Sequence, residues 1–315
     1  MKNIVIIYRK VNLRNKNDTV PKIMEPFISK NLSNNYLIKY RHCMDNSILY
    51  SISRLDYFHI LFLLFTRLDQ FLYLIGISSN RILRSRLYLH LFKVNNIDLV
   101  LTIMPNKSCN QAANLIESSV KTIELQHGVI GSNHKYYKYK NSQEIPSTFV
   151  VWTDYDKEVI RRLNPSLKTN FIVDGIPTLY GYDKDRKVNK FSRDFRILFA
   201  TQPSIKDVLI PPIFLESLKQ TNKKNIEISV RQHPSLNLKL FRRKLRRIRS
   251  VFPELVFVEQ LTESPVLDSL LGSDLVITWH STIIREATAL KIPSIALSPD
   301  LLPNGERHDN YHEER

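Results

Sequence analysis

The sequence predicts a protein of two α/β domains, each built on a parallel β-sheet. Short runs of branched apolar residues alternate with longer helical patterns along most of the chain. The 315 residues fit two domains of about 150 residues each, and a hydrophobic content of 43% is enough to fill two cores. A charged stretch without apolar periodicity, residues 181–193, interrupts the alternation. We therefore place a domain boundary there.

The first domain is predicted to span residues 1–182. Its apolar segment 57–77 is interrupted near the centre by Arg67, Asp69 and Gln70, where charge is costly inside a membrane. We expect a half-buried helix there, with contact to a membrane surface as the alternative. The first expected strand begins at Lys2, and the others lie at 36–40, 98–103, 121–125, 148–152 and 171–173. The expected helices lie at 21–32, within 51–92, at 112–118 and at 154–163.

A linker is predicted at residues 183–194 and a second domain at 195–315. The second domain ends in DLVITWHSTIIREATALKIPSIAL, residues 274–297, which has the pattern of a strand, a helix and a second strand. Such a unit belongs in a parallel sheet, with its chemistry at the carboxyl end of the first strand. The expected strands lie at 196–200, 226–230, 255–258, 275–278 and 294–297, and the expected helices at 212–220, 238–250, 265–271 and 283–290.

Composition narrows the class of partner. A net charge of +16 favours an anionic partner, which leaves nucleic acid, anionic lipid or a phosphorylated substrate, although an AT-rich genome accounts for part of the excess. The chain has only seven glycines, and neither the GxGxxG nor the GxxxxGK[ST] pattern of nucleotide-binding loops occurs in it. The usual glycine-rich phosphate loop is therefore not expected. Cys43 and Cys109 form no CxxC, which favours a reducing compartment and excludes a cysteine-based zinc site. The first residues lack a signal-peptide cleavage site, so we expect a cytoplasmic protein.

Polar residues follow one strand of the first domain. Gln126, His127 and Gly128 come directly after the strand 121–125, and His134 and Tyr137 follow shortly afterwards. Gly128 permits a sharp turn that exposes His127 at the carboxyl edge of the sheet, where an imidazole can act as a general base. A structural histidine that is hydrogen-bonded within a loop is the alternative. We assign His127 to catalysis and the other four residues to the acceptor side.

Polar residues also follow three strands of the second domain. Hydroxyls and free N–H groups at a helix start suit phosphate, arginine and histidine are phosphate partners, and a carboxylate one turn into a helix suits a sugar diol. Taken singly, each has a structural alternative: a helix cap for Ser281 and ordinary surface turns for the other loops. Their convergence on one sheet edge favours a nucleotide-sugar pocket that faces the His127 loop across a cleft. The donor-binding residues are Thr201, Gln202, Arg231, His233, Ser281, Thr282 and Glu286.

The order of these motifs resembles a known group of enzymes. A strand followed by QHG, a strand followed by RQHP, and SDLVITWHSTIIREATALKIPSIA are similar to bacterial GT-B-fold glycosyltransferases of surface-polysaccharide synthesis. The sequence is similar to the sialyltransferase and polysialyltransferase groups of capsule and lipo-oligosaccharide synthesis, and also to the CDP-glycerol glycerophosphotransferases. The resemblance covers about Asp98 to Pro299 and implies two Rossmann-like domains facing across a cleft.

The resemblance also implies a division of roles. Arg231, His233 and the Ser281–Thr282 pair would hold the donor phosphate, Glu286 would hold ribose or sugar, and His127 would be the base. Sugar would then pass from a nucleotide-activated donor to a cell-surface glycan, with no metal or other cofactor, because cationic side chains neutralise the leaving phosphate. A polyol-phosphate transferase of the CDP-glycerol type and a nucleotide-sugar epimerase are alternatives.

The basic segment FRRKLRRIR, residues 241–249, leaves two further hypotheses open. A solvated helix face is the usual explanation of such charge, and contact with an anionic membrane surface is the sharper one, placing the enzyme on the inner face of the cell membrane. A basic nucleic-acid-binding protein is the alternative from another class. The sequence lacks a helix-turn-helix, zinc or RNA-recognition signature, so we expect no nucleic-acid partner.

Overall fold

The structure, a computed structural model, describes residues 2–8, 24, 27–28, 36–43, 57–76, 82–103, 105–116, 120–126, 128–131, 135–139, 141–179, 195–202, 208–220, 226–234, 236–261, 264–279 and 281–297. The chain divides into two compact units. The first unit comprises Met1–His127 and His134–Pro177, and the second comprises Gly128–Asn133 and Thr178–Arg315. The predicted linker at 183–194 lies outside the described residues.

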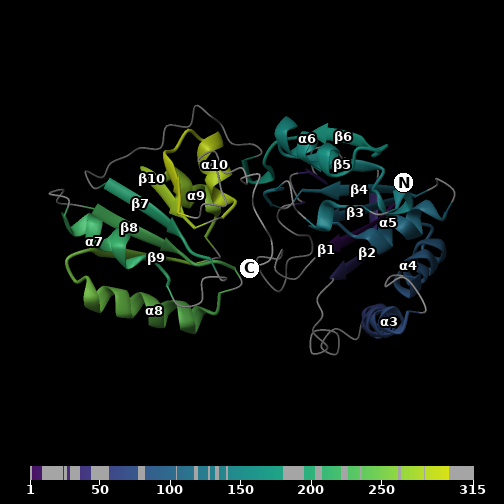
Figure 1. The fold of residues 1–315 in the computed structure, drawn as a ribbon, viewed down its shortest axis with the longest axis horizontal. Helices are drawn as coiled ribbons and strands as arrows, with labels where there is room; N and C mark the ends of the chain where they lie inside the picture. The colour runs from purple at the N-terminus through teal and green to yellow at the C-terminus, as the bar shows by residue number, and fades with distance from the viewer. Residues whose placement is uncertain are drawn as a thin grey trace. The chain divides into compact units, whose positions relative to one another are not determined.

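The first unit contains a parallel sheet (Figure 1). In the described residues its strand order is β2-β1-β3-β4-β5-β6, and every neighbouring pair is parallel. The chain reverses its direction of travel across the sheet between β1 and β3, as in doubly wound folds. The strands are β1 (Lys2–Tyr8), β2 (Tyr36–Cys43), β3 (Leu99–Ile103), β4 (Lys121–Leu125), β5 (Thr148–Val151) and β6 (Asn170–Val173).

Both faces of this sheet are apolar, because alternate residues of a central strand point to opposite sides. Leu99, Leu101 and Ile103 of β3 join one core cluster, whereas Val100 joins the cluster on the other side. That second cluster includes buried residues of three helices. The α-helices of this unit with described bounds are α3 (Tyr57–Leu74), α4 (Ile82–Val94), α5 (Lys107–Asn114) and α6 (Asp154–Leu163).

The second unit contains another parallel sheet, with the strand order β11-β10-β7-β8-β9 in the described residues. The strands are β7 (Phe195–Ala200), β8 (Ile226–Arg231), β9 (Val256–Gln260), β10 (Leu275–Thr278) and β11 (Ser294–Ala296). The helices are α7 (Pro212–Gln220), α8 (Leu238–Val251), α9 (Val266–Leu271) and α10 (Ile283–Ala289). Buried residues of α7 and α8 cover one face, and those of α9 and α10 cover the other.

The predicted fold class is confirmed: the protein is α/β, with two Rossmann-like halves built on parallel sheets. Most of the helix predicted at 21–32 lies outside the described residues. Within that range the structure describes residues 24 and 27–28. Across the part of the chain that the structure describes, no helix combines the length and the apolar character needed to cross a bilayer.

Candidate functional site

The carboxyl ends of three neighbouring strands form one edge of the second sheet. β7 lies between β8 and β10, and both pairings are parallel. The strand order reverses between β7 and β10, which is the position where open α/β sheets bind ligands. The predicted donor residues lie in β8, in α10 or in the loops at this edge. The topology therefore brings the three predicted loops to one place.

Thr201 connects two of these strand ends. Its Oγ1 donates a hydrogen bond of 2.8 Å to the carbonyl oxygen of Arg231, and it accepts one of 3.0 Å from the backbone N–H of His233. The side chain of Thr201 is buried, whereas His233 and Gln202 are partly exposed. Thr201 therefore fixes the loop after β8. Within the RQHP motif, His233 and Pro234 are the residues that solvent reaches.

Arg231 is the last residue of β8 rather than the first of the loop. Its guanidinium donates hydrogen bonds of 2.8 Å to Ser269 Oγ and of 2.8 Å to the carbonyl oxygen of Ser264. The residue is buried, so these bonds attach the end of β8 to the start of α9. Its positive charge also acts on Glu286, where it partly opposes the rise in pKa that burial causes.

Thr278 connects the other strand ends. Its Oγ1 donates to the carbonyl oxygen of Ala200 over 3.1 Å and accepts from the backbone N–H of Ser281 over 3.3 Å. Ser281 Oγ accepts a 3.4 Å hydrogen bond from Ile283 N, which is the capping role that the sequence offered as the alternative. Thr282 is the N-cap residue of α10, and its side chain makes no capping hydrogen bond.

Glu286 is a buried carboxyl group within α10. Burial raises its pKa, while a hydrogen bond from Thr178 and the charge of Arg231 oppose that shift. The Oγ1 of Thr178 donates this hydrogen bond to Glu286 Oε1. Thr178 belongs to the short 3-10 helix Pro177–Leu179 and was missed by the sequence analysis, because 108 residues separate the partners.

The residues assigned to the acceptor side have different surroundings. Gln126 is buried and accepts a 2.8 Å hydrogen bond from Trp152 N, and Tyr137 is buried with its ring 6.5 Å from that of Phe149. Both contribute to the interior of the first unit. Gly128 belongs to the second unit, where a Cβ atom on it would lie 3.6 Å from Thr282 Cγ2. His127 and His134 lie outside the described residues.

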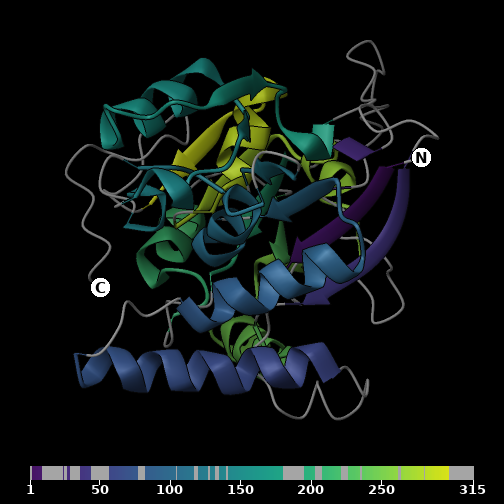
Figure 2. The same ribbon diagram turned by 90° about the vertical axis from the view of Figure 1, so that its right-hand side faces the viewer.

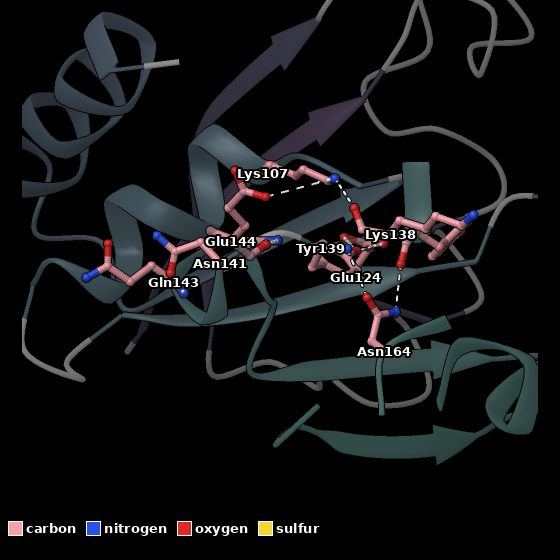
Figure 3. A network of polar contacts seen from close by, with 10 residues as sticks. Lys107, Glu124, Lys138, Tyr139, Asn141, Gln143, Glu144 and Asn164 are labelled. Atoms are coloured by element: carbon pink, nitrogen blue, oxygen red, sulfur yellow. Dashed lines mark hydrogen bonds and ion pairs between the residues drawn. The ribbon is translucent and has the colours of Figure 1, made fainter. Parts of the chain in front are cut away.

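A second buried carboxyl group, Glu124 in β4, lies in the first unit and had no signal in the sequence (Figure 3). Burial raises its pKa from an ordinary value of 4.5 to about 8, although hydrogen bonds and the charge of Lys107 oppose the shift. The hydroxyl of Tyr139 lies 3.4 Å from Glu124 Oε1. Asn164 Oδ1 accepts a 2.9 Å hydrogen bond from Tyr139 N, and Lys107 Nζ lies 5.0 Å from the centre of the Tyr139 ring. A glutamate within the strand KTIEL gives little sign of these distant contacts.

The first of two Asp-x-Asp patterns, Asp154 to Asp156, has a structural explanation. Thr153 is the N-cap residue of α6 and accepts a hydrogen bond from Asp156 N. The hydroxyl of Thr153 donates over 2.8 Å to the carboxylate of Asp156, which is buried. The pattern thus belongs to a helix start. The second pattern, residues 183–185, lies outside the described residues.

The chain has two Rossmann-like halves, each built on a parallel sheet, and this is the GT-B fold. No family model matches the sequence, and no similar curated protein is found. Solved structures with the same fold include S. aureus MnaA with UDP, at 13% identity and a TM-score of 0.55 over 95% of this chain and 80% of that one.

Two further structures have the same fold. UDP-GlcNAc 2-epimerase from Neisseria meningitidis, bound to UDP-GlcNAc, is similar at 15% identity and a TM-score of 0.54 over 94% of this chain and 82% of that one. Acinetobacter baumannii MurG is similar at 9% identity and a TM-score of 0.54 over 97% of this chain and 81% of that one. These likenesses establish the GT-B fold of the chain.

Proposed function

We propose that the protein is an enzyme that binds a nucleotide-activated sugar and transfers the sugar to a growing cell-surface glycan. One observation carries the proposal: the loops after β7, β8 and β10 lie together at the switch point of the second sheet. They offer a partly exposed histidine, two hydroxyls and a buried carboxyl group, which suit a phosphate and a sugar diol.

The roles follow from the contacts. His233 would contact the donor phosphate from the loop after β8, which its backbone N–H anchors to Thr201. Glu286 would accept hydrogen bonds from ribose or sugar hydroxyls, with Thr178 holding its carboxyl group in place. Arg231 would help to position Glu286 and Thr178 through its positive charge. Its own guanidinium is held by Ser269 in α9 and by the carbonyl oxygen of Ser264. His127 remains our proposal for the general base.

Structures of similar fold support a nucleotide-sugar substrate, because the printed ligands are UDP for MnaA and UDP-GlcNAc for the meningococcal epimerase. Those ligands also favour a second candidate function, epimerisation of a nucleotide sugar. MurG, a glycosyltransferase of the same fold, favours sugar transfer over epimerisation as the reaction. The sialyltransferase-like and CDP-glycerol-type assignments rest on the sequence motifs alone.

Turnover assays separate transfer from epimerisation. The protein is incubated with UDP-, CMP-, GDP- and dTDP-sugars and with CDP-glycerol, with and without a membrane extract that supplies glycan acceptors. Transfer predicts release of free nucleotide that depends on the extract, and His233→Ala should reduce its rate by about tenfold or more, the loss of one phosphate contact. Formation of a C2 epimer without any acceptor would contradict transfer and establish the second candidate.

We also propose that turnover needs no metal, since Arg231 supplies positive charge at this sheet edge and His233 lies in the loop beside it. The turnover assay is repeated after treatment with EDTA, and the rate should not change. Loss of activity that Mn²⁺ restores would overturn this part of the proposal without affecting the assignment of the sheet edge.

A further inference from the structure

Helix α3 exposes a continuous apolar stripe. Leu64, Leu68 and Phe71 follow one another at intervals of four and three residues, which places them on one side of the helix, and the exposed Ile75 follows directly after the helix end. Leu64 is 59% exposed and Phe71 is 57% exposed. Leu74, at the end of the helix, is 81% exposed. Single exposed apolar residues are common, but a contiguous row of this kind marks an interaction surface.

The opposite side of α3 is already occupied. The ring of Phe62 lies 5.7 Å from that of Tyr88 in α4, and both side chains are buried. Asp69 is also buried and accepts hydrogen bonds of 3.0 Å and 3.1 Å from the backbone N–H groups of Leu83 and Arg84. α3 is therefore fixed along α4, as the two blue helices in Figure 2 show, and the stripe is not the face that packs into this core.

The charges around the stripe indicate its partner. Arg67 on α3 and Arg86 and Lys93 on α4 are exposed. Asp69 is the one acidic residue of the two helices, and it is buried in an ion pair with Arg84. The exposed surface of this helix pair is thus apolar and cationic. We propose that α3 docks on an anionic lipid bilayer, with the stripe among the acyl chains and the basic residues at the phosphate groups.

The basic helix α8 is the competing surface, for which the sequence left open a solvated helix face and contact with an anionic membrane. Its apolar residues Phe241 and Leu245 are buried against the second sheet, so α8 offers a bilayer its charge and the exposed Val251 at its end, but no apolar stripe. Arg242 is moreover paired with Glu259 at 2.7 Å. Charge without an apolar face gives weak, salt-sensitive attachment. α3 combines both contributions and does not depend on the proposed enzymatic function.

Sedimentation with vesicles tests the proposal. Wild-type protein is mixed with phosphatidylglycerol–phosphatidylcholine vesicles and with pure phosphatidylcholine vesicles, and binding should be at least about tenfold tighter on the anionic ones. The triple variant Leu64→Ser, Leu68→Ser, Phe71→Ser should bind the anionic vesicles about a hundredfold more weakly. Ile213→Ser with Val256→Ser is the matched control, since these residues are 78% and 57% exposed in the second unit and should not matter.

A second variant keeps the test independent of folding. Phe71→Trp places a fluorophore in the stripe, and its emission should move to shorter wavelength when anionic vesicles are added. Vesicle binding that survives the triple substitution, or that Arg243→Ser with Arg247→Ser in α8 abolishes alone, would overturn the proposal. So would a lipid-free wild type that forms a dimer which the triple variant cannot form, because the stripe would then be a protein interface.

Discussion

Glu124 illustrates how a single residue acquires unusual chemistry from its surroundings. The carboxyl group lies in the interior of the first unit, where burial penalises its charged form more than its polar neighbours stabilise that form. Its pKa of about 8 means that the folded protein keeps the proton at neutral pH. In the unfolded chain the same group titrates near 4.5. The folded state binds more protons between these values, so stability falls as the pH rises from about 4.5 to about 8.

Replacement of Glu124 with glutamine should remove this dependence. Glutamine keeps the shape and an oxygen that can accept from Tyr139, but it carries no charge at any pH. At pH 9 the variant should be more stable than the wild type by a few kcal/mol, on the order of 3, whereas at pH 5 the two should be similar. Urea unfolding at pH 5, 7 and 9 measures the difference.

Glu158→Gln provides the control for this measurement, because the Glu158 side chain is 55% exposed in an ion pair with Arg161 on α6. Its stability should follow that of the wild type throughout. A Glu124→Gln protein whose stability changes with pH in parallel with the wild type would show that Glu124 does not hold a proton at neutral pH.

The candidate site shows what residue-level prediction can and cannot reach. Thr201, His233 and Ser281 were identified because they follow strands, and strand ends are visible as the points where apolar runs stop. The hydrogen bond from Thr178 to Glu286 has no such signal, since it joins two places far apart in the chain. The bonds of Arg231 to α9 were missed for the same reason.

At the scale of the element, boundaries were predictable where a cap or a change of pattern marks them. α6 spans the predicted residues 154–163, and its start is fixed by Thr153, whose hydroxyl accepts from Asp156 N. α5 was placed too late, because it begins at Lys107 after the cap residue Asn106. Its polar first turn, KSCN, lacks the apolar periodicity that located the other helices.

Asp69 joins two elements, and its removal should destabilise the protein. Its buried carboxylate accepts from two backbone N–H groups at the start of α4 and pairs with Arg84 at 3.2 Å. Asp69→Ala leaves these donors and the arginine without their partner, so unfolding should require roughly 2–4 kcal/mol less free energy. Denaturant titration of the full chain measures this difference.

Asp154→Ala is the matched control for that experiment. Asp154 also lies at a helix start, but its side chain is 81% exposed in an ion pair with Lys157. Its replacement should cost about 0.5 kcal/mol or less. Equal losses in the two variants would indicate that the contacts of Asp69 contribute no more than those of a surface carboxylate.

At the scale of the whole molecule, the parallel order of both sheets was predictable, because strands and helices alternate along the sequence. The net charge of +16 was equally visible, yet it could not distinguish a phosphate-bearing substrate, a lipid surface and a nucleic acid. The structure adds that the predicted donor residues share one sheet edge and that α3 carries an exposed apolar stripe. These are separate surfaces with separate tests.

The central claim is that a nucleotide binds at the carboxyl edge of the second sheet. Thermal unfolding is followed with UDP, CMP, CDP, GDP and dTDP for the wild type, for His233→Ala, and for His90→Ala, an exposed histidine of α4 in the first unit. At a nucleotide concentration of about 100 times Kd, binding should stabilise the wild type by roughly 2.7 kcal/mol. The same nucleotide should stabilise His90→Ala equally and His233→Ala much less. Absence of stabilisation by every nucleotide, or equal stabilisation of all three proteins, would contradict the claim.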